Sequence, residues 1–418
     1  MLNSCFAINF GLIQEDVIMN VPWRLPFLFG GPAAEDFHIS SAGDDLSAEE
    51  WLLQNGELLR KKQEEWLAAG IGGLCAPTAF SHAFCPDHRE ALREQVRLLN
   101  AGLLEITRSA AQRFGVPVGA RVGSSGLFVP PYGQADFDDI YNGYRDQIRV
   151  LEQSGAEFVL IENQSSMADM RAAVLASRTS DFPVCVTLSV DESGKTLTGG
   201  SLLPAVITLQ AMGVEAIGLG GSMSPLEMLP LLKEVMPHAS VPLCAIPSSD
   251  GLSPEEFADQ ARALLRAGVP VLGIGGDQTP EHWRALHQCA QEPFSFESDY
   301  ADADCYASAT ETEAFFLGSD ITLSEPIECS IALEEDLIDL DDEQVNAALI
   351  ELNTLDDVML LSQFGSVTRL PLAVHTDSRT ILEAALRYVQ GRLIVDTNCQ
   401  IDLELIERTA AKYGAIVY

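Results

Sequence analysis

Positive charge is scarce in this chain. Its 418 residues include 25 Lys and Arg against 61 Asp and Glu, which gives a formal net charge of −36. A polyanion of this size is repelled by phosphate backbones and anionic lipids, so we expect no nucleic acid and no membrane surface as a partner. Solubility is the simplest interpretation of the charge, and a surface that docks a basic partner is the alternative. No run of about 18 apolar residues occurs, so no membrane span is expected.

The sequence also lacks paired cysteine motifs. Its nine cysteines are odd in number and include no CxxC pair, and several lie inside apolar strands, as in Val184-Cys185-Val186 and Leu243-Cys244-Ala245. These features are typical of buried free thiols in a reducing cytosol rather than of a disulfide framework. Asn3 and the Glu15-Asp16 pair interrupt the first residues, which does not support a signal peptide. We therefore expect a cytoplasmic protein.

What the chain has is a regular alternation of short apolar strands and amphipathic helices. The expected strands are Leu25–Phe29, Gly72–Ala76, Val116–Val122, Glu157–Ile161, Val184–Val190, Ala216–Leu219, Leu243–Ile246 and Val271–Ile274. The expected helices are Glu49–Ala69, about 87–114, Phe137–Ser154, Met167–Ser177, Leu202–Met212, Pro225–Val235, Pro254–Ala267 and one from Pro280. Eight such units over roughly 270 residues predict an α/β fold, a (β/α)8 TIM barrel over residues 1–291.

The starts of the later helices support this interpretation. Ser224-Pro225-Leu226-Glu227 and Ser253-Pro254-Glu255-Glu256 place Ser at the N-cap, Pro at the first helical position and Glu two positions later. This arrangement is a capping box with a preset φ angle. Thr279-Pro280-Glu281 repeats the first two parts, and Gly70 and Gly268 suit the left-handed residue that ends a helix.

The composition of the sequence changes after residue 291, where acidic residues cluster without apolar periodicity. Residues 292–318 are predicted to be an acidic linker, and 319–418 a smaller partial βα domain. Its expected strands are Asp357–Leu361, Leu370–Val374, Arg392–Asp396 and Ala415–Tyr418, and its helices are Arg379–Val389 and Leu403–Tyr413. Half a barrel leaves a sheet edge that needs covering, and a homodimer that pairs such edges is one expectation. A further acidic cluster from Glu334 to Glu343 is interpreted as solvated surface.

Glycines stand at the strand ends where a barrel keeps its chemistry. Gly220, Gly221, Gly275 and Gly276 follow two of the apolar strands. Exposed backbone N–H groups in such turns could cradle an anion, but close packing explains glycine pairs equally well. The neighbouring Asp277 would oppose an anion.

Several short segments carry a resemblance when they are taken in order. They are Leu28-Phe29-Gly30-Gly31, Pro77-Thr78-Ala79-Phe80, Gly123–Gly126 with Pro130–Gly133, Ile161-Glu162, Gly194–Gly199, Ser224–Leu232, Thr279–His282 and the tail Arg369–Tyr418. This order resembles the homocysteine S-methyltransferase family, and more specifically the N-terminal two-barrel half of cobalamin-dependent methionine synthases. The tail is similar to strands three to five of that family's pterin-binding barrel. The resemblance covers nearly the whole chain.

The resemblance implies a zinc ion held by three cysteine thiolates, which would bind the substrate thiol as the methyl-accepting nucleophile. At the matching positions this sequence has Gly221, Gly275 and Gly276, so zinc is not expected. The family's first Asp is replaced by Phe29 and its Asn by Thr78, and in the tail its polar cofactor contacts are replaced, for example by His375 and Asp396.

The sequence offers a few other candidate metal ligands and catalytic groups. Cys75, His82, Cys85 and His88 could form a replacement metal site, but their spacing is not that of a zinc finger. A buried Cys75 beside an ordinary rim loop is the simpler interpretation. His38 is a candidate base, since His titrates near neutrality, although a lone loop His is more often a surface residue. Glu162 is the second catalytic candidate; it could bind a substrate amino group or accept backbone N–H groups.

The predicted substrate-binding residues share a place at the strand ends. They are Gly30, Gly31, Thr78, Glu162, Asn163, Gly220, Gly221, Gly275, Gly276 and Asp277. The resemblance implies a methyltransferase without zinc thiolates that moves methyl groups between a small-molecule substrate and a corrinoid (cobalamin) partner protein. The alternative is a non-catalytic binding or scaffold protein of a methyl-transfer system.

Overall fold

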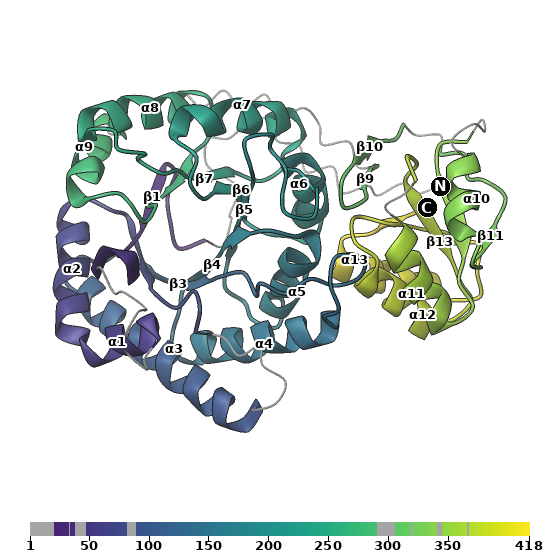
Figure 1. Cartoon of the computed structure of the whole chain (residues 1–418), viewed down its shortest axis with the longest axis horizontal. Coiled ribbons are helices and arrows are strands. Elements are labelled where there is room, and N and C mark those ends of the chain that lie inside the picture. Colours follow the sequence, from purple (N-terminus) through teal and green to yellow (C-terminus); the bar gives the residue numbers. More distant parts are fainter. Residues whose placement is uncertain are drawn as a thin grey trace.

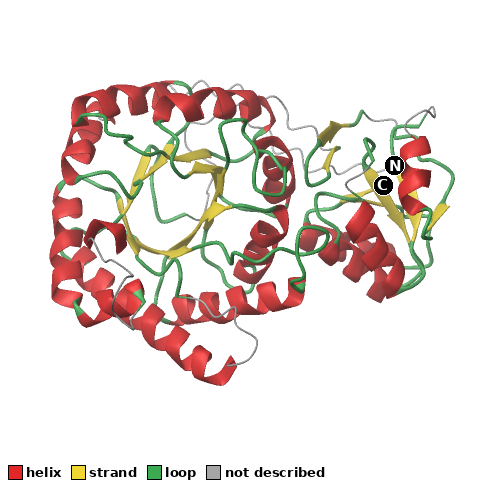
Figure 2. Cartoon of the chain, viewed as in Figure 1, coloured by secondary structure: helices red, strands yellow, loops and turns green. Residues whose placement is uncertain are grey.

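The computed structural model describes residues 21–32, 34–37, 47–81, 89–290, 306–318, 321–340, 345–365 and 368–418. Eight parallel strands close into a barrel in chain order (Figures 1 and 2). They are β1 (Phe27–Gly30), β2 (Gly73–Ala76), β3 (Val118–Val122), β4 (Phe158–Gln164), β5 (Val184–Ser189), β6 (Ala216–Gly220), β7 (Leu243–Ile246) and β8 (Val271–Gly273). The predicted (β/α)8 barrel is confirmed.

Helices surround the barrel as the hydrophobic periodicity predicts. They are α1 (Ala48–Gln54), α2 (Gly56–Ala68), α3 (Arg89–Ala111), α4 (Phe137–Gln153), α5 (Met167–Ser177), α6 (Leu202–Ala211), α7 (Pro225–Val235), α8 (Pro254–Arg266) and α9 (Pro280–Ala290), with 3-10 turns at Ala34–Phe37 and Met236–His238. Both predicted capping boxes, at Ser224 and Ser253, are present. One prediction differs from the structure: the single helix expected at Glu49–Ala69 is two helices, α1 and α2, which meet at Asn55.

Aromatic side chains fill the inside of the barrel at its amino-terminal end. Trp23 stacks on Phe27 with ring centroids 4.9 Å apart, Phe27 stacks on Phe29 at 5.0 Å, and Phe158 meets these rings edge-on. Gly73 and Gly119 make room for them, because a Cβ at either position would lie about 2.5 Å from a ring carbon. The barrel is therefore a packed core rather than a pore.

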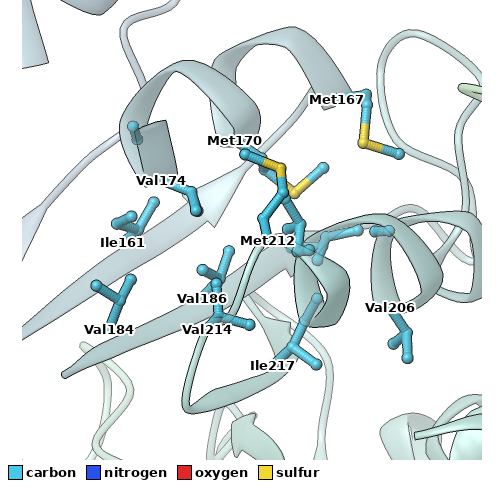
Figure 3. Close-up of a cluster of buried hydrophobic side chains, with 14 of the residues drawn as sticks. Ile161, Met167, Met170, Val174, Val184, Val186, Val206, Met212, Val214 and Ile217 are labelled. Carbon is cyan, nitrogen blue, oxygen red and sulfur yellow. The ribbon is translucent and has the colours of Figure 1, made fainter. Parts of the chain in front are cut away.

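A second apolar layer joins the strands to the helices. Figure 3 shows part of it, in which Val184, Val186 and Ile217 from the strands face Met170 and Met212 from the helix layer. Branched side chains on the sheet and flexible methionines above them fill the irregular space between the two layers.

The C-terminal part is a separate parallel sheet of five strands, in the order β11, β12, β13, β14 and β15. Its elements are β11 (Ile327–Glu328), α10 (Leu333–Asp339), β12 (Ala348–Glu351), α11 (Leu355–Phe364), β13 (Leu372–His375), α12 (Arg379–Tyr388), β14 (Ile394–Val395), α13 (Leu403–Tyr413) and β15 (Ile416–Val417). The prediction of a strand at Asp357–Leu361 is wrong. This segment lies in α11, which begins with a capping box between Thr354 and Asp357, and the strand is instead Ala348–Glu351.

A short segment before this sheet covers its inner face. Within the predicted linker the chain forms a two-stranded hairpin, β9 (Ala307–Ala309) and β10 (Ala314–Phe316). Leu317 and Ile321 then pack against Leu349 and Ile394 of the sheet. The helices α11, α12 and α13 cover the opposite face (Figure 1). The partial domain is thus a sheet with both faces covered, as parallel sheets require.

The barrel and the C-terminal sheet meet along α5 and α6, beside β9 and α13 (Figure 1). All eleven residues of α5 are buried, and Ile207 of α6 packs against Ala307 and Ala309 of the hairpin. A helix that is buried all round needs cover on its outer side as well as on its sheet side. Although α5 is buried on all sides, neither it nor any other helix in the described ranges is both long and apolar enough to cross a membrane.

Candidate functional site at the barrel mouth

A buried ion pair lies at the carboxyl end of the barrel strands. Arg121 on β3 donates through Nη2 to the carbonyl oxygen of Gly31 at 2.9 Å, and its Nε lies 3.8 Å from Oε2 of Glu162 on β4. The side chains of Arg121 and Glu162 are only 7% and 11% exposed. Below them, burial raises the pKa of Cys75 to about 12 although Arg121 lowers it, so this thiol stays protonated. The mouth thus offers a cation and an anion side by side.

Thr78, Gly30 and Gly31 shape this site through the backbone. The Thr78 hydroxyl donates to the carbonyl oxygen of Arg121 at 2.7 Å and accepts from its N–H, so it holds β3 in place. A Cβ at Gly30 would lie 2.6 Å from Ile274, and one at Gly31 would lie 2.8 Å from the carbonyl oxygen of Cys75. Close packing therefore accounts for both glycines, and their predicted role in substrate binding stays a prediction.

A second buried carboxylate organises the loop that follows β3. Asp169 in the first turn of α5 accepts from the Ser124 hydroxyl at 2.6 Å, from the Ser125 N–H at 3.0 Å and from the Tyr144 hydroxyl at 2.7 Å. Burial raises the pKa of Asp169 against the effect of these hydrogen bonds. The network fixes the Ser124–Gly126 loop, which follows the strand that carries Arg121.

Asn163 adopts an uncommon conformation next to Glu162. Its φ is +54°, in the left-handed region, and β4 changes register against β5 between Ile161 and Gln164. The Thr187 hydroxyl accepts from its backbone N–H at 3.1 Å, and its Oδ1 lies 2.4 Å from the point where a Cβ of Gly220 would be. A non-glycine residue at φ > 0 is held there by its surroundings, and such residues cluster at functional sites.

The glycines on the opposite side of the mouth offer no side-chain donors. A Cβ at Gly275 would lie 2.4 Å from the carbonyl oxygen of Pro247, and one at Gly221, where φ is +111°, would lie 3.0 Å from the Ser189 hydroxyl. Only Gly276, of these three, has nothing within 4 Å. Thiolates at these three positions would need side chains that two of the sites have little room for, so the residues present do not fit the family's zinc site.

Asp277 serves the neighbouring loop. Its carboxylate accepts from the hydroxyls of Ser248 and Ser249 and from the N–H groups of Ser249 and Asp250 at 2.7 to 3.1 Å. Burial opposes ionisation, but these hydrogen bonds together lower the pKa of Asp277. The carboxylate is occupied by the protein, and its predicted contact with substrate stays a prediction.

Of the remaining candidates, the structure describes Cys75 alone. His38, His82, Cys85 and His88 lie outside the described residues. Cys75 is buried in the aromatic core of the barrel. Within the described ranges, no group of three or more His, Cys, Asp or Glu side chains is placed to hold a metal ion.

Sequence reasoning missed Arg121 and the Asp169 network. Arg121 carried a usable signal, since an arginine inside the apolar run Val118–Val122 has to be paired if the strand is buried. Asp169 had none, because an acidic residue in the first turn of a helix is ordinary.

The closed barrel of eight parallel strands, with helices around it, defines a TIM-barrel protein. A family model described as homocysteine S-methyltransferase matches residues 32–290. The chain belongs to the homocysteine S-methyltransferase family.

Two methionine synthases are similar in sequence. That of Mycobacterium tuberculosis strain H37Rv is 24% identical over 376 residues, covering 78% of this chain and 31% of the relative. That of Mycobacterium leprae is 26% identical over 217 residues, covering 47% of this chain and 18% of the relative. The chain therefore spans at most about a third of the length of these relatives.

Solved structures are similar in fold. The metallated form of the homocysteine methyltransferase MmuM from Escherichia coli matches with a TM-score of 0.54 at 17% identity, covering 63% of this chain and 95% of that one. Its oxidized form matches with a TM-score of 0.53 at 18% identity and the same coverage. At this identity the likeness concerns the fold alone.

Proposed function

We propose that the barrel mouth binds a small zwitterionic substrate and takes part in methyl transfer with a corrinoid partner protein, without a zinc-bound thiolate. The observation that carries this proposal is the Arg121–Glu162 pair, two nearly buried charges whose Nε and Oε2 atoms are 3.8 Å apart. Both charges lie at the carboxyl ends of β3 and β4, which is the end of a (β/α)8 barrel where substrates bind. Family membership supports methyl transfer as the type of reaction.

Glu162 and Arg121 would each bind the substrate group of opposite charge. The Glu162 carboxylate suits the ammonium or methylated ammonium group of a substrate, and the Arg121 guanidinium suits its carboxylate. Asn163 directly follows Glu162, and the Ser124–Gly126 loop follows the strand that carries Arg121, so we expect both to lie close to a bound substrate. A methyl group leaving a cationic nitrogen or sulfur atom needs orientation and charge stabilisation from the protein, and the corrinoid on its partner would supply the methyl-accepting centre.

A calorimetric titration tests binding. Homocysteine, methionine, S-methylmethionine and glycine betaine are titrated into the wild-type chain and into Glu162→Gln, with Glu281→Gln on the outer rim as the matched control. We expect at least one ligand to bind and Glu162→Gln to weaken it by about tenfold or more, while the control stays unchanged. A chain that binds none of the four ligands contradicts the proposal.

A second candidate function is a scaffold that keeps the fold without turnover. The observation in its favour is that Arg121 already donates to Gly31 and that Asp169 and Asp277 are saturated by their own loops. Free cob(I)alamin and each methylated ligand are incubated with the chain, and methylcobalamin is followed by its absorbance. Methylcobalamin formation that depends on Glu162 favours the enzyme. No formation, together with capture of a corrinoid protein in a pull-down, favours the scaffold, and one zinc per chain by elemental analysis would contradict the zinc-free part of both.

A further inference from the structure

An arginine of the barrel forms hydrogen bonds with the carboxyl end of α12 in the C-terminal sheet domain. Arg171 on α5 donates through Nη2 to the carbonyl oxygen of Leu386 at 2.5 Å, and through Nη1 to the carbonyl of Val389 at 2.8 Å and to Oε1 of Gln390 at 3.0 Å. The last carbonyls of a helix have no partner within it, and a cation is favourable there. α12 ends at Tyr388, and its C-cap residue Val389 is extended and is not a glycine, so Arg171 binds the last carbonyls instead.

This contact is fully inside the protein. Arg171 is 1% exposed, and burial lowers its pKa to about 10, which leaves the side chain charged at neutral pH. A buried charge of this kind is tolerated because backbone and amide oxygens surround it. Moving α12 away from α5 would leave both the guanidinium and the helix carbonyls without partners, which ties the two parts rigidly.

The same end of α12 also holds α4. Arg387 pairs with Asp138 in the first turn of α4, and the Tyr388 hydroxyl donates to Oδ2 of Asp138 at 3.0 Å. The Tyr388 ring meets Phe137 edge-on at 6.1 Å. α4 and α5 are the helices that follow β3 and β4, and these strands carry Arg121 and Glu162.

Helix α5 reaches the mouth directly. Its N-cap, Ser166, lies four residues after Glu162, and Asp169 on its first turn fixes Ser124 and Ser125. Glu311, in the segment that joins the two parts, has hydrogen bonds with the Thr198 side chain and the Met167 backbone at the start of α5. One rigid helix thus contacts the C-terminal domain on one side and the mouth loop on the other.

We infer that the C-terminal domain is a positioning part of the barrel mouth, and that Arg171 and Asp138 are the positioning residues through which α12 fixes the Ser124–Gly126 loop and the Glu162 segment. Its relevance to substrate rests on the proposed function, but the positioning itself does not require a ligand. The two can therefore fail separately.

Amide hydrogen exchange on the full chain tests this inference. In Arg171→Met we expect exchange at 122–128 and 160–168 to rise by about tenfold or more, while 216–224 on the far side of the mouth stays within about twofold of wild type. Arg171→Lys, which keeps the charge, should restore part of the protection. Arg108→Met is the matched control, because Arg108 also donates to a backbone carbonyl, that of Ser154, at the opposite end of α4.

A milder variant covers the case in which Arg171→Met does not fold. Arg387→Met removes the pair with the half-exposed Asp138 and should raise exchange in the same two segments by a smaller factor. Exchange that rises evenly around the barrel, or only within 345–418, would overturn the inference. Loss of protection at the two segments in a chain that binds no tested ligand would leave the inference standing and count against the proposed function alone.

Discussion

The barrel and the C-terminal sheet solve the same problem in different ways. Both are parallel sheets with helices on one face and an apolar inner face that has to be kept from water. The barrel closes β8 onto β1 and fills the enclosed space with Phe27, Phe29 and Phe158. The five-stranded sheet stays open, and the chain segment that carries Leu317 and Ile321 lies across it. Closure uses side chains of the strands themselves, whereas the open sheet depends on a preceding segment.

This difference predicts that the two regions tolerate the truncation of a core side chain to different degrees. An enclosed aromatic core has packed neighbours on every side, so a missing ring leaves a void that nothing can fill. A segment laid over an open sheet has more freedom to shift and close part of a void. The inner face of the barrel should therefore be the less tolerant of the two.

The largest effect is expected for Phe27→Ala in the barrel. Removing this fully buried ring takes away two stacking partners and leaves a cavity, at a cost of about 3–5 kcal/mol in the free energy of unfolding. Urea denaturation followed by tryptophan fluorescence measures it. A cost below about 1 kcal/mol would mean that the barrel interior relaxes as readily as a surface.

A smaller effect is expected for Ile394→Ala in the open sheet. Ile394 is fully buried beneath the covering segment, and its truncation should cost about 2 kcal/mol, the low end for such changes, because that segment can settle. The same urea titration, read from amide exchange in residues 345–418, reports it. A cost equal to that of Phe27→Ala would break the comparison.

The next effect concerns room at the carboxyl end of the closed barrel. A methyl group at Gly275 meets the carbonyl oxygen of Pro247, so Gly275→Ala should cost about 1–3 kcal/mol. Gly276→Ala, one residue on, meets nothing and should stay within about 0.5 kcal/mol of wild type. Thermal unfolding of the two variants side by side gives the difference, and equal midpoints would show that the rim moves freely.

The smallest effect tests the joint between the two regions through pH. Burial raises the pKa of Glu311 despite its bonds to Thr198 and Met167, so the native state holds this proton more tightly than the unfolded state. Stability contributed by Glu311 is then present at low pH and lost as pH rises from about 4.5 through the folded pKa. Glu311→Gln should gain stability relative to wild type between pH 4 and pH 8. A relative loss over this range would contradict the buried environment of the carboxylate.

The barrel was predictable from the sequence because its signals are local. Ser253 and Glu256 mark a helix start by their spacing alone, and Val184–Val190 is apolar enough to be a buried strand. The open sheet was harder, because Asp357–Leu361 is as apolar as a strand when Thr354 is not recognised as its cap. A short apolar run has no period that separates a strand from a helix.

The site was predictable only in part. Glu162 was identified from its place after a strand, but its charged partner Arg121 lies 41 positions earlier, and only the closed sheet brings the two together. The positive φ of Asn163 and its fit against Gly220 depend on the register change in β4, which leaves no mark in the sequence.

The full burial of α5 has a consequence for how this molecule can be divided. The family match ends at residue 290. A fragment that ended there would expose the apolar outer side of α5 and the guanidinium of Arg171 to solvent. The end of the family match is therefore a poor place to divide this chain. Fragments made for crystallisation, and chimaeras that exchange the barrel, should include the chain through Tyr413, because α13 helps to cover the barrel helices at this interface.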